Sequence, residues 1–207
     1  MELESRLRYK TGVKLDAEQA ADYLRVSYFT LVRYLNRGDV PGKKKGKSWE
    51  IDKERLDKKF YPRGEYPKDD YTGLGDQIFD LPELAEYLGV SIHKIYDGWM
   101  TTRKPVRGQI PVAKIGGSYK ARKELVDRLF DPWKLKREDF SEEGDEIWDI
   151  NGLADYLGID DPLSLYKHIH NISDGKKILE GKIPGTCIGG RWRFKKWVVD
   201  LASQEAT

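Results

Sequence analysis

The 207-residue sequence contains one cysteine, three histidines and no run of about 18 apolar residues. The single cysteine, Cys187, excludes an intrachain disulfide and a thiolate zinc cluster. His168 and His170 lie two residues apart, which does not place both on one helical face, so no metal site is expected. A Gly-rich phosphate loop and a nucleophile paired with a base are also missing. The sequence therefore predicts neither an enzyme nor a cofactor.

The net charge is small, +2 at pH 7, but it is unevenly distributed. Residues 1–60 contain 15 Lys and Arg against 10 Asp and Glu, and residues 79–130 contain 9 against 6. Residues 148–207 are balanced at 8 against 8, whereas residues 61–78 contain 2 against 4 and residues 131–147 contain 3 against 7. This distribution is expected if the basic parts face phosphates and the acidic parts face water.

Three segments begin with the same pattern, an Asp followed by an amphipathic stretch that ends in Tyr-Leu. The pattern occupies residues 16–24, 80–88 and 149–157. The leading Asp suits the N-cap of a helix, and Gln19 and Glu83 complete a capping box three residues later. Each segment is therefore predicted to start with a short helix that buries one face.

A second helix and a hairpin are predicted to follow in each segment. Ser27, Ser91 and Asp161 suit the caps of the second helices, so that two helices separated by a tight turn form a helix-turn-helix. A Gly-centred β-hairpin, or wing, comes next, and a last amphipathic helix ends the segment. The hairpins share one aromatic position that is expected to anchor them to the helices: Trp49, Tyr119 and Trp192.

The predicted fold class is mainly α with small β-hairpins, an α+β chain of three tandem winged helix-turn-helix modules. The predicted modules are residues 12–60 (segment 1), 79–130 (segment 2) and 148–203 (segment 3). Residues 61–78 and 131–147 are predicted connectors.

Segment 1 resembles the excisionase or MerR-type winged helix-turn-helix family. The matching residues are Leu15, Ala20 or Ala21, Leu24, Val26, Ser27, Arg37, Gly38, Pro41 and Gly46. The resemblance implies that the second helix enters the major groove of DNA and that the hairpin touches the phosphates.

The residues expected to contact DNA are the outward positions of the second helices and the cations of the hairpins. Segment 1 contributes Tyr28, Phe29, Arg33, Arg37, Lys43, Lys44, Lys45 and Lys47. Segment 2 contributes His93, Lys94, Tyr96, Lys114, Lys120 and Arg122. Segment 3 contributes Ser164, Lys167, Arg191, Arg193 and Lys195.

Arg33 is the preferred candidate for direct base reading, because a guanidinium can donate to guanine O6 and N7 together. The alternative is an ordinary solvated helix residue. Tyr28 and Phe29 are expected either to touch thymine methyls and sugars or to pack on a neighbouring segment. Asp97 stands at the Arg33 position in segment 2, where phosphate would repel it unless it accepts from a cytosine amino group.

These patterns predict a sequence-specific double-stranded DNA-binding protein, either a transcription regulator or an excisionase-like accessory factor of a phage or mobile element. A recombinase and RNA polymerase are the candidate protein partners, and the sequence carries no signal for an oligomeric state. No membrane association is expected, and the expected location is the cytoplasm, at the nucleoid. The competing hypothesis is a protein-interaction scaffold in which one or more segments no longer bind DNA.

Overall fold

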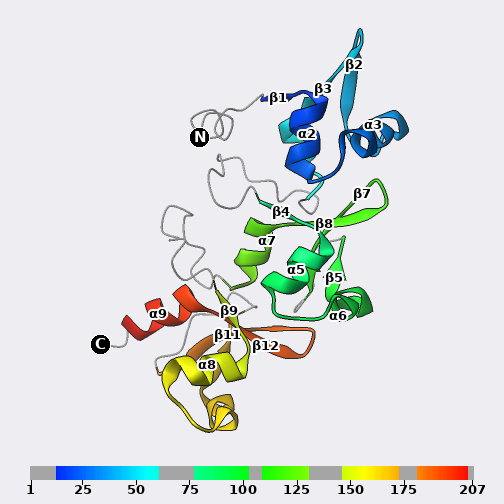
Figure 1. Cartoon of the computed structure of the whole chain (residues 1–207). Coiled ribbons are helices and arrows are strands. Elements are labelled where there is room, and N and C mark those ends of the chain that lie inside the picture. Colours follow the sequence, from blue (N-terminus) through cyan, green and yellow to red (C-terminus); the bar gives the residue numbers. More distant parts are fainter. Residues whose placement is uncertain (1–12, 61–76, 103–108, 131–145, 173–180, 205–207) are drawn as a thin grey trace. The chain divides into compact units, whose positions relative to one another are not determined.

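The computed structural model describes residues 13–60, 77–102, 109–130, 146–172 and 181–204 (Figure 1). Its helices and short strands confirm the expected mixture of α and β structure. Contacts divide the chain into two compact units. The first contains Met1–Leu81, Thr102–Lys104 and Pro111–Glu124, and the second contains Pro82–Thr101, Pro105–Ile110 and Leu125–Thr207. No described helix is long and apolar enough to cross a membrane.

Segment 1 lies in the first unit and begins with two capped helices. The strand β1 (Lys14–Leu15) leads into α2 (Ala17–Leu24), where Asp16 and Gln19 form the predicted capping box. Arg25 ends α2 in the left-handed region at φ 52°. The next helix, α3 (Tyr28–Arg37), starts at Ser27, whose hydroxyl accepts from the Thr30 amide at 3.2 Å. Gly38 ends α3 at φ 78°, as is common for a left-handed C-cap.

The hairpin and the last helix of segment 1 follow directly. Strands β2 (Gly42–Lys45) and β3 (Ser48–Asp52) pair antiparallel, and β1 pairs with the other edge of β3. Helix α4 (Lys53–Asp57) then closes the segment. A small core results, in which the following side chains are fully buried: Leu24, Leu31, Ile51 and Leu56.

The hairpin of segment 2 also belongs to the first unit. It consists of β7 (Ala113–Ile115) and β8 (Ser118–Arg122), and β4 (Ile78–Phe79) pairs with the other edge of β8. The strand order β4-β8-β7 corresponds to the order β1-β3-β2 of segment 1.

The other elements of segment 2 are short. They are α5 (Leu81–Tyr87), α6 (Ile92–Lys94), a π-helical turn η2 (Ile95–Trp99), the paired strands β5 (Met100–Thr101) and β6 (Ile110–Pro111), α7 (Lys123–Asp127) and the 3-10 helix η3 (Arg128–Phe130).

Segment 3 lies in the second unit and is built on a four-stranded sheet. Its elements are β9 (Ile147–Trp148), α8 (Ile150–Leu157), the 3-10 helix η5 (Pro162–His168), β10 (Ile169–Asn171), β11 (Ile183–Ile188), β12 (Arg191–Lys195) and α9 (Lys196–Gln204). The strand order is β10-β11-β12-β9, with β10 parallel to β11 and the other pairs antiparallel. Leu153, Leu165 and Phe194 form the centre of its core.

The second helix differs among the segments. In segment 1 it is a ten-residue α-helix, as predicted. In segment 2 the α-helix spans three residues, because Asp97 and Gly98 take non-helical backbone angles and Gly98 has a φ of 104°. In segment 3 the second helix is the 3-10 helix η5. The regular recognition helix predicted for segments 2 and 3 is thus shortened or rewound.

One feature of the fold was not predicted from the sequence, and one prediction lies outside the described residues. The two-residue strand that opens each segment was missed, because two residues show no measurable periodicity. Most of the predicted connectors, residues 61–76 and 131–145, lie outside the part of the chain that the structure describes.

Candidate nucleic-acid interface

Helix α3 separates a buried face from an exposed one. Leu31, Tyr34 and Leu35 are buried, and the outward face carries the predicted reading residues. Tyr28 is 45% exposed and Phe29 is 83% exposed. Their rings meet edge to face, with centroids 5.8 Å apart. Apolar surface held this far out of the core at a helix N-terminus is available to a ligand.

Arg33 and Arg37 complete the outward face of α3. Both side chains are exposed. The guanidinium carbon of Arg33 lies 5.8 Å from the centre of the Tyr34 ring. The guanidinium of the exposed Arg33 is thus near an aromatic ring of its own helix.

The hairpin of segment 1 is a cationic projection next to α3. It extends past the helices of its segment (Figure 1), and every residue of β2 is exposed. Gly46 forms its turn at φ 63°. Trp49, the predicted anchor, is partly buried. The exposed cations of this hairpin are those that the sequence predicted: Lys43, Lys44, Lys45 and Lys47.

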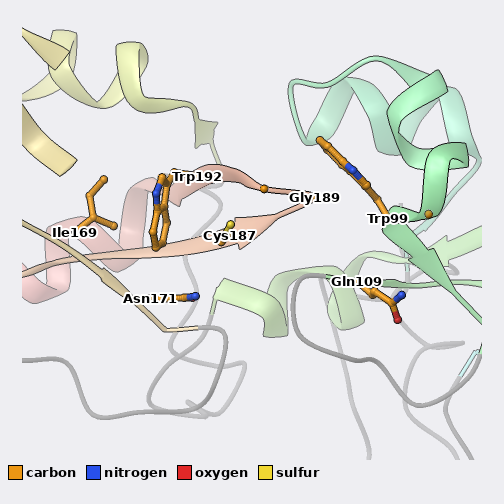
Figure 2. A pocket seen from close by; sticks show the side chains of 9 residues that line it. Trp99, Gln109, Ile169, Asn171, Cys187, Gly189 and Trp192 are labelled. Atoms are coloured by element: carbon orange, nitrogen blue, oxygen red, sulfur yellow. The ribbon is translucent and has the colours of Figure 1, made fainter. Parts of the chain in front are cut away.

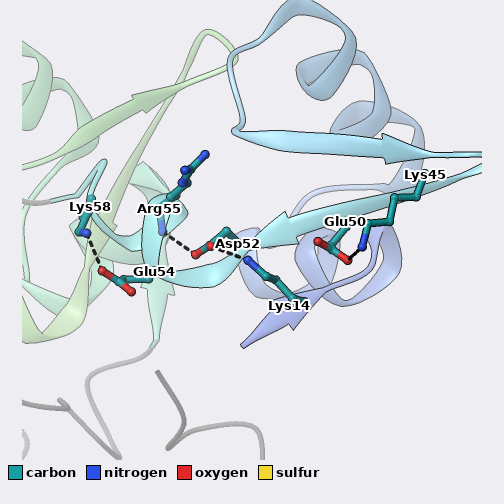
Figure 3. A network of polar contacts seen from close by, with 7 residues as sticks. All are labelled: Lys14, Lys45, Glu50, Asp52, Glu54, Arg55 and Lys58. Carbon is teal, nitrogen blue, oxygen red and sulfur yellow. Dashed lines mark hydrogen bonds and ion pairs between the residues drawn. The ribbon is translucent and has the colours of Figure 1, made fainter. Parts of the chain in front are cut away.

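Two acidic residues of β3 are engaged by lysines of the same segment (Figure 3). The Lys45 amine lies 2.6 Å from Glu50, and this hydrogen bond holds the pKa of the Glu50 carboxyl below its usual value. The Lys14 amine lies 2.6 Å from Asp52 and lowers the pKa of that carboxyl in the same way. Lys45 is therefore partly neutralised, whereas Lys43, Lys44 and Lys47 form no ion pair with a carboxylate within the part of the chain that the structure describes.

Residues 15–58 match the family model of a helix-turn-helix domain. The match covers α2, α3, the hairpin and most of α4. Helix-turn-helix domains bind DNA through their second helix, which in this chain is α3. No curated protein and no solved structure shows significant similarity to the chain.

The other predicted contact residues fall into two groups. Those at the surface or partly buried are His93, Lys94, Tyr96, Lys114, Ser164, Lys167 and Arg191. Those that are buried are Lys120, Arg122, Arg193 and Lys195. We expected these last four cations to contact phosphates, but they are buried. Each contacts a carbonyl or carboxylate oxygen of the protein instead.

Lys120 and Arg122 project from β8 onto segment 1. Lys120 is 5% exposed and donates to the Arg25 carbonyl at 3.4 Å, where α2 ends. Arg122 is 3% exposed, and its guanidinium lies 3.3 Å from Asp57 of α4. Within the first unit, the hairpin of segment 2 is thus docked on segment 1.

Arg193 and Lys195 repeat this arrangement one segment later. Arg193 donates to the Leu88 carbonyl at 2.7 Å and to the Gly89 carbonyl at 3.1 Å, where α5 ends. Burial lowers the pKa of its guanidinium. Lys195 donates to the Tyr87 hydroxyl and lies 3.1 Å from Asp127 of α7. Within the second unit, the hairpin of segment 3 is docked on the helices of segment 2.

In each segment, a tyrosine of the first helix and an aspartate of the last helix form a hydrogen bond that was not predicted from the sequence. In segments 1 and 2 this pair belongs to the surface that receives the docked hairpin, called the receiving surface. The Tyr23 hydroxyl donates to Asp57 at 2.5 Å, the Tyr87 hydroxyl donates to Asp127, and the Tyr156 hydroxyl donates to Asp200 at 2.6 Å. The signal was present in the sequence, because a Lys precedes the Asp by four residues in all three last helices, starting at residues 53, 123 and 196.

The turns of the docked hairpins rest on aromatic rings. A Cβ on Gly116 would lie 2.0 Å from the Tyr34 ring of α3, and a Cβ on Gly189 would lie 1.6 Å from the Trp99 ring. Figure 2 shows the turn at Gly189 reaching Trp99. A hollow of about 690 Å³ lies beside this turn, lined mainly by uncharged groups including Trp192 and Cys187. Among the described residues, no group of His, Cys, Asp and Glu is placed to hold a metal ion.

We expect Gly116→Ala to destabilise the protein more than Gly46→Ala. Both glycines have a left-handed φ, +58° and +63°, so both changes carry the backbone penalty of about 1–2 kcal/mol. Only Gly116 adds a steric conflict, with the buried Tyr34, and overpacking costs about 1–3 kcal/mol more. Urea unfolding of the two variants measures the difference. Equal losses of unfolding free energy would show that the turn of β7 and β8 does not rest on Tyr34.

Proposed function

We propose that this chain is a sequence-specific double-stranded DNA-binding protein that acts by binding rather than by catalysis. The helix-turn-helix domain in segment 1 reads DNA, with α3 in the major groove and the β2–β3 hairpin on the phosphate backbone. The observation that carries the proposal is the combination on one domain of an outward face on α3, with Phe29 and Arg33, and an exposed lysine hairpin.

The three segments are proposed to be copies of one winged helix-turn-helix module. Support comes from the order of a strand, two helices, a hairpin and a helix, which recurs from β1 to α4, from β4 to α7 and from β9 to α9. The Tyr-Asp hydrogen bond between the first and last helix also recurs in each segment.

Segments 2 and 3 are proposed to contribute less to base reading than segment 1. Their second helices lack the ten-residue α-helix of segment 1, and four of their basic hairpin side chains are buried. These observations favour the scaffold hypothesis for segments 2 and 3 while segment 1 binds DNA. The chain would then be a DNA reader joined to a protein-binding array, which suits a transcription regulator contacting RNA polymerase or an accessory factor contacting a recombinase.

Arg33→Ala tests the reading role of α3. A bidentate contact between arginine and guanine contributes about 1–3 kcal/mol of discrimination, so the affinity for the preferred site is expected to fall roughly 5- to 150-fold. The exposed position predicts an unchanged unfolding midpoint. The preferred site is first selected from a random duplex pool with the full chain, and affinities are measured by fluorescence anisotropy.

Lys58→Ala is the matched control, because it also removes one positive charge from the same domain. Lys58 is exposed and lies at the end of α4. If Arg33 reads bases, the Arg33→Ala variant loses its preference for the selected site, whereas the Lys58→Ala variant keeps it. Equal small losses in both variants would contradict base reading by α3.

A further inference from the structure

Segment 3 carries the same receiving surface that segments 1 and 2 use to hold a hairpin. Asp200 of α9 accepts from the Tyr156 hydroxyl at 2.6 Å and pairs with Lys196 at 3.0 Å. Gly158 ends α8 in the left-handed region at φ 66°, as Arg25 and Gly89 do at 52° and 60° after the first helices of the other segments. Tyr156, Leu157, Gly158 and Asp200 are called the terminal face below.

The corresponding surfaces of segments 1 and 2 are covered, whereas the terminal face is open. Leu24 and Leu88 are fully buried, but Leu157 at the same position is 38% exposed, and Tyr156 is 46% exposed. Four of the seven exposed large hydrophobic side chains among the described residues belong to segment 3, which places an uncovered apolar surface on α8 and η5. The four are Tyr156, Leu157, Leu163 and Tyr166.

The docked hairpins define what the terminal face can hold. In both, a basic side chain four residues after the first turn glycine meets the carbonyls at the end of the first helix, and a second one two residues later meets the aspartate. In a strand, residues two apart project from the same face. The occupant must therefore present two cations two residues apart on one side of a hairpin strand.

Among the described residues, no hairpin of this kind is left undocked. The hairpins of segments 2 and 3 are held on segments 1 and 2. The hairpin of segment 1 has Glu50 and Asp52 at the two positions, four and six residues after Gly46, and these carboxylates would face Asp200. The same charges prevent copies of the chain from adding end to end through this contact.

We propose that the terminal face binds a β-hairpin of a different protein, one that carries two basic side chains two residues apart on a strand. Asp200 pairs with the second base, the carbonyls of Leu157 and Gly158 accept from the first, and the exposed rings of Tyr156 and Tyr166 receive the apolar part of the hairpin. This site is independent of the DNA-reading face on α3.

A cyclised fluorescent peptide with the sequence of residues 183–195 is the probe for this site. Titration with the full chain, followed by anisotropy, is expected to show saturable binding, and Asp200→Lys is expected to weaken it at least tenfold. A probe with glutamate and aspartate at its two basic positions should bind the native chain at least tenfold more weakly and should recover affinity for Asp200→Lys. Asp200→Asn, which keeps the size of the side chain, should weaken binding of the native probe in the same direction.

Three outcomes of the probe titrations would overturn the proposal. They are absence of probe binding, equal affinity for the native chain and Asp200→Lys, and failure of the reversed probe to distinguish the two proteins. Sedimentation velocity of the full chain tests whether the terminal face is instead occupied by a second copy of the chain. Concentration-dependent dimers that Asp200→Lys abolishes would assign the terminal face to a second copy and contradict a foreign hairpin.

Discussion

Replacing Lys43, Lys44 and Lys47 together by glutamine is expected to lower the affinity for duplex DNA at least tenfold at 0.1 M salt. These lysines are exposed on the projecting hairpin of the helix-turn-helix domain. Each phosphate contact releases counterions and contributes about −0.9 to the slope of log affinity against log salt concentration. If all three lysines touch phosphates, the slope becomes less negative by about 2.7. The measurement is a series of anisotropy titrations between 50 and 200 mM salt.

The matched control removes the exposed cations of the other two hairpins. Lys114 of β7 and Arg191 of β12 are exposed, and each lies on a hairpin that is docked by its buried residues. The double change to glutamine removes two cations instead of three, and it is expected to alter the slope less per replaced charge than the change in segment 1. An unchanged slope in the triple variant would contradict phosphate binding by the β2–β3 hairpin. A larger change of the slope in the control variant would show that the DNA interface lies on segments 2 and 3.

Local sequence rules predicted the elements that build the helix-turn-helix domain of segment 1. Asp16 and Ser27 accept the amide hydrogen bonds expected of N-caps, and Gly38 and Gly46 take the left-handed angles that end α3 and turn the hairpin. These features depend on residues within one turn of each other, so that the sequence alone carries the information.

The environment of the basic hairpin residues could not be predicted by the same rules. Alternation in β8 and β12 correctly places two cations on one face of each strand, and a charged strand face ordinarily lies in water. Here carbonyls at a helix end and an aspartate in the preceding segment satisfy those cations. For Arg193 and Lys195, such partners lie 68 to 105 residues away in the sequence, so no local pattern identifies them. The spacing of Lys and Asp in the last helices was the one indication available.

The second helices show where a shared pattern conceals a structural difference. Ser27 and Ser91 both precede apolar residues at helical spacing, yet only α3 continues for ten residues. Gly98 lies where segment 1 has Tyr34, and a glycine at φ 104° ends the helical backbone there. Trp99 contacts the turn of the segment 3 hairpin, just as Tyr34 of the intact α3 contacts the turn of the segment 2 hairpin, so the docking contact is present whether the helix is long or short.

Asp57→Ala is expected to lower the free energy of unfolding by about 3–5 kcal/mol. Asp57 is 4% exposed and accepts from Tyr23 at 2.5 Å and from Lys53 at 2.9 Å, while Arg122 lies 3.3 Å away. The change removes a buried carboxylate from Lys53 and Arg122; Glu124, 3.5 Å from the Arg122 guanidinium, then compensates that charge only in part, and breaking a buried ion pair costs more than the pair itself contributes. Urea unfolding followed by circular dichroism measures the change.

Asp200→Ala provides the comparison, because Asp200 has the same tyrosine and lysine partners but, among the described residues, no cation from another segment. Its ion pair is solvent-accessible, and exposed pairs stabilise proteins little, so the unfolding midpoint should change only slightly. The difference in unfolding free energy between the two variants therefore measures the effect of burying Asp57 beneath the docked β8 strand. If Asp57→Ala were as mild as Asp200→Ala, Arg122 would not be held on segment 1, and its guanidinium would again be available to DNA.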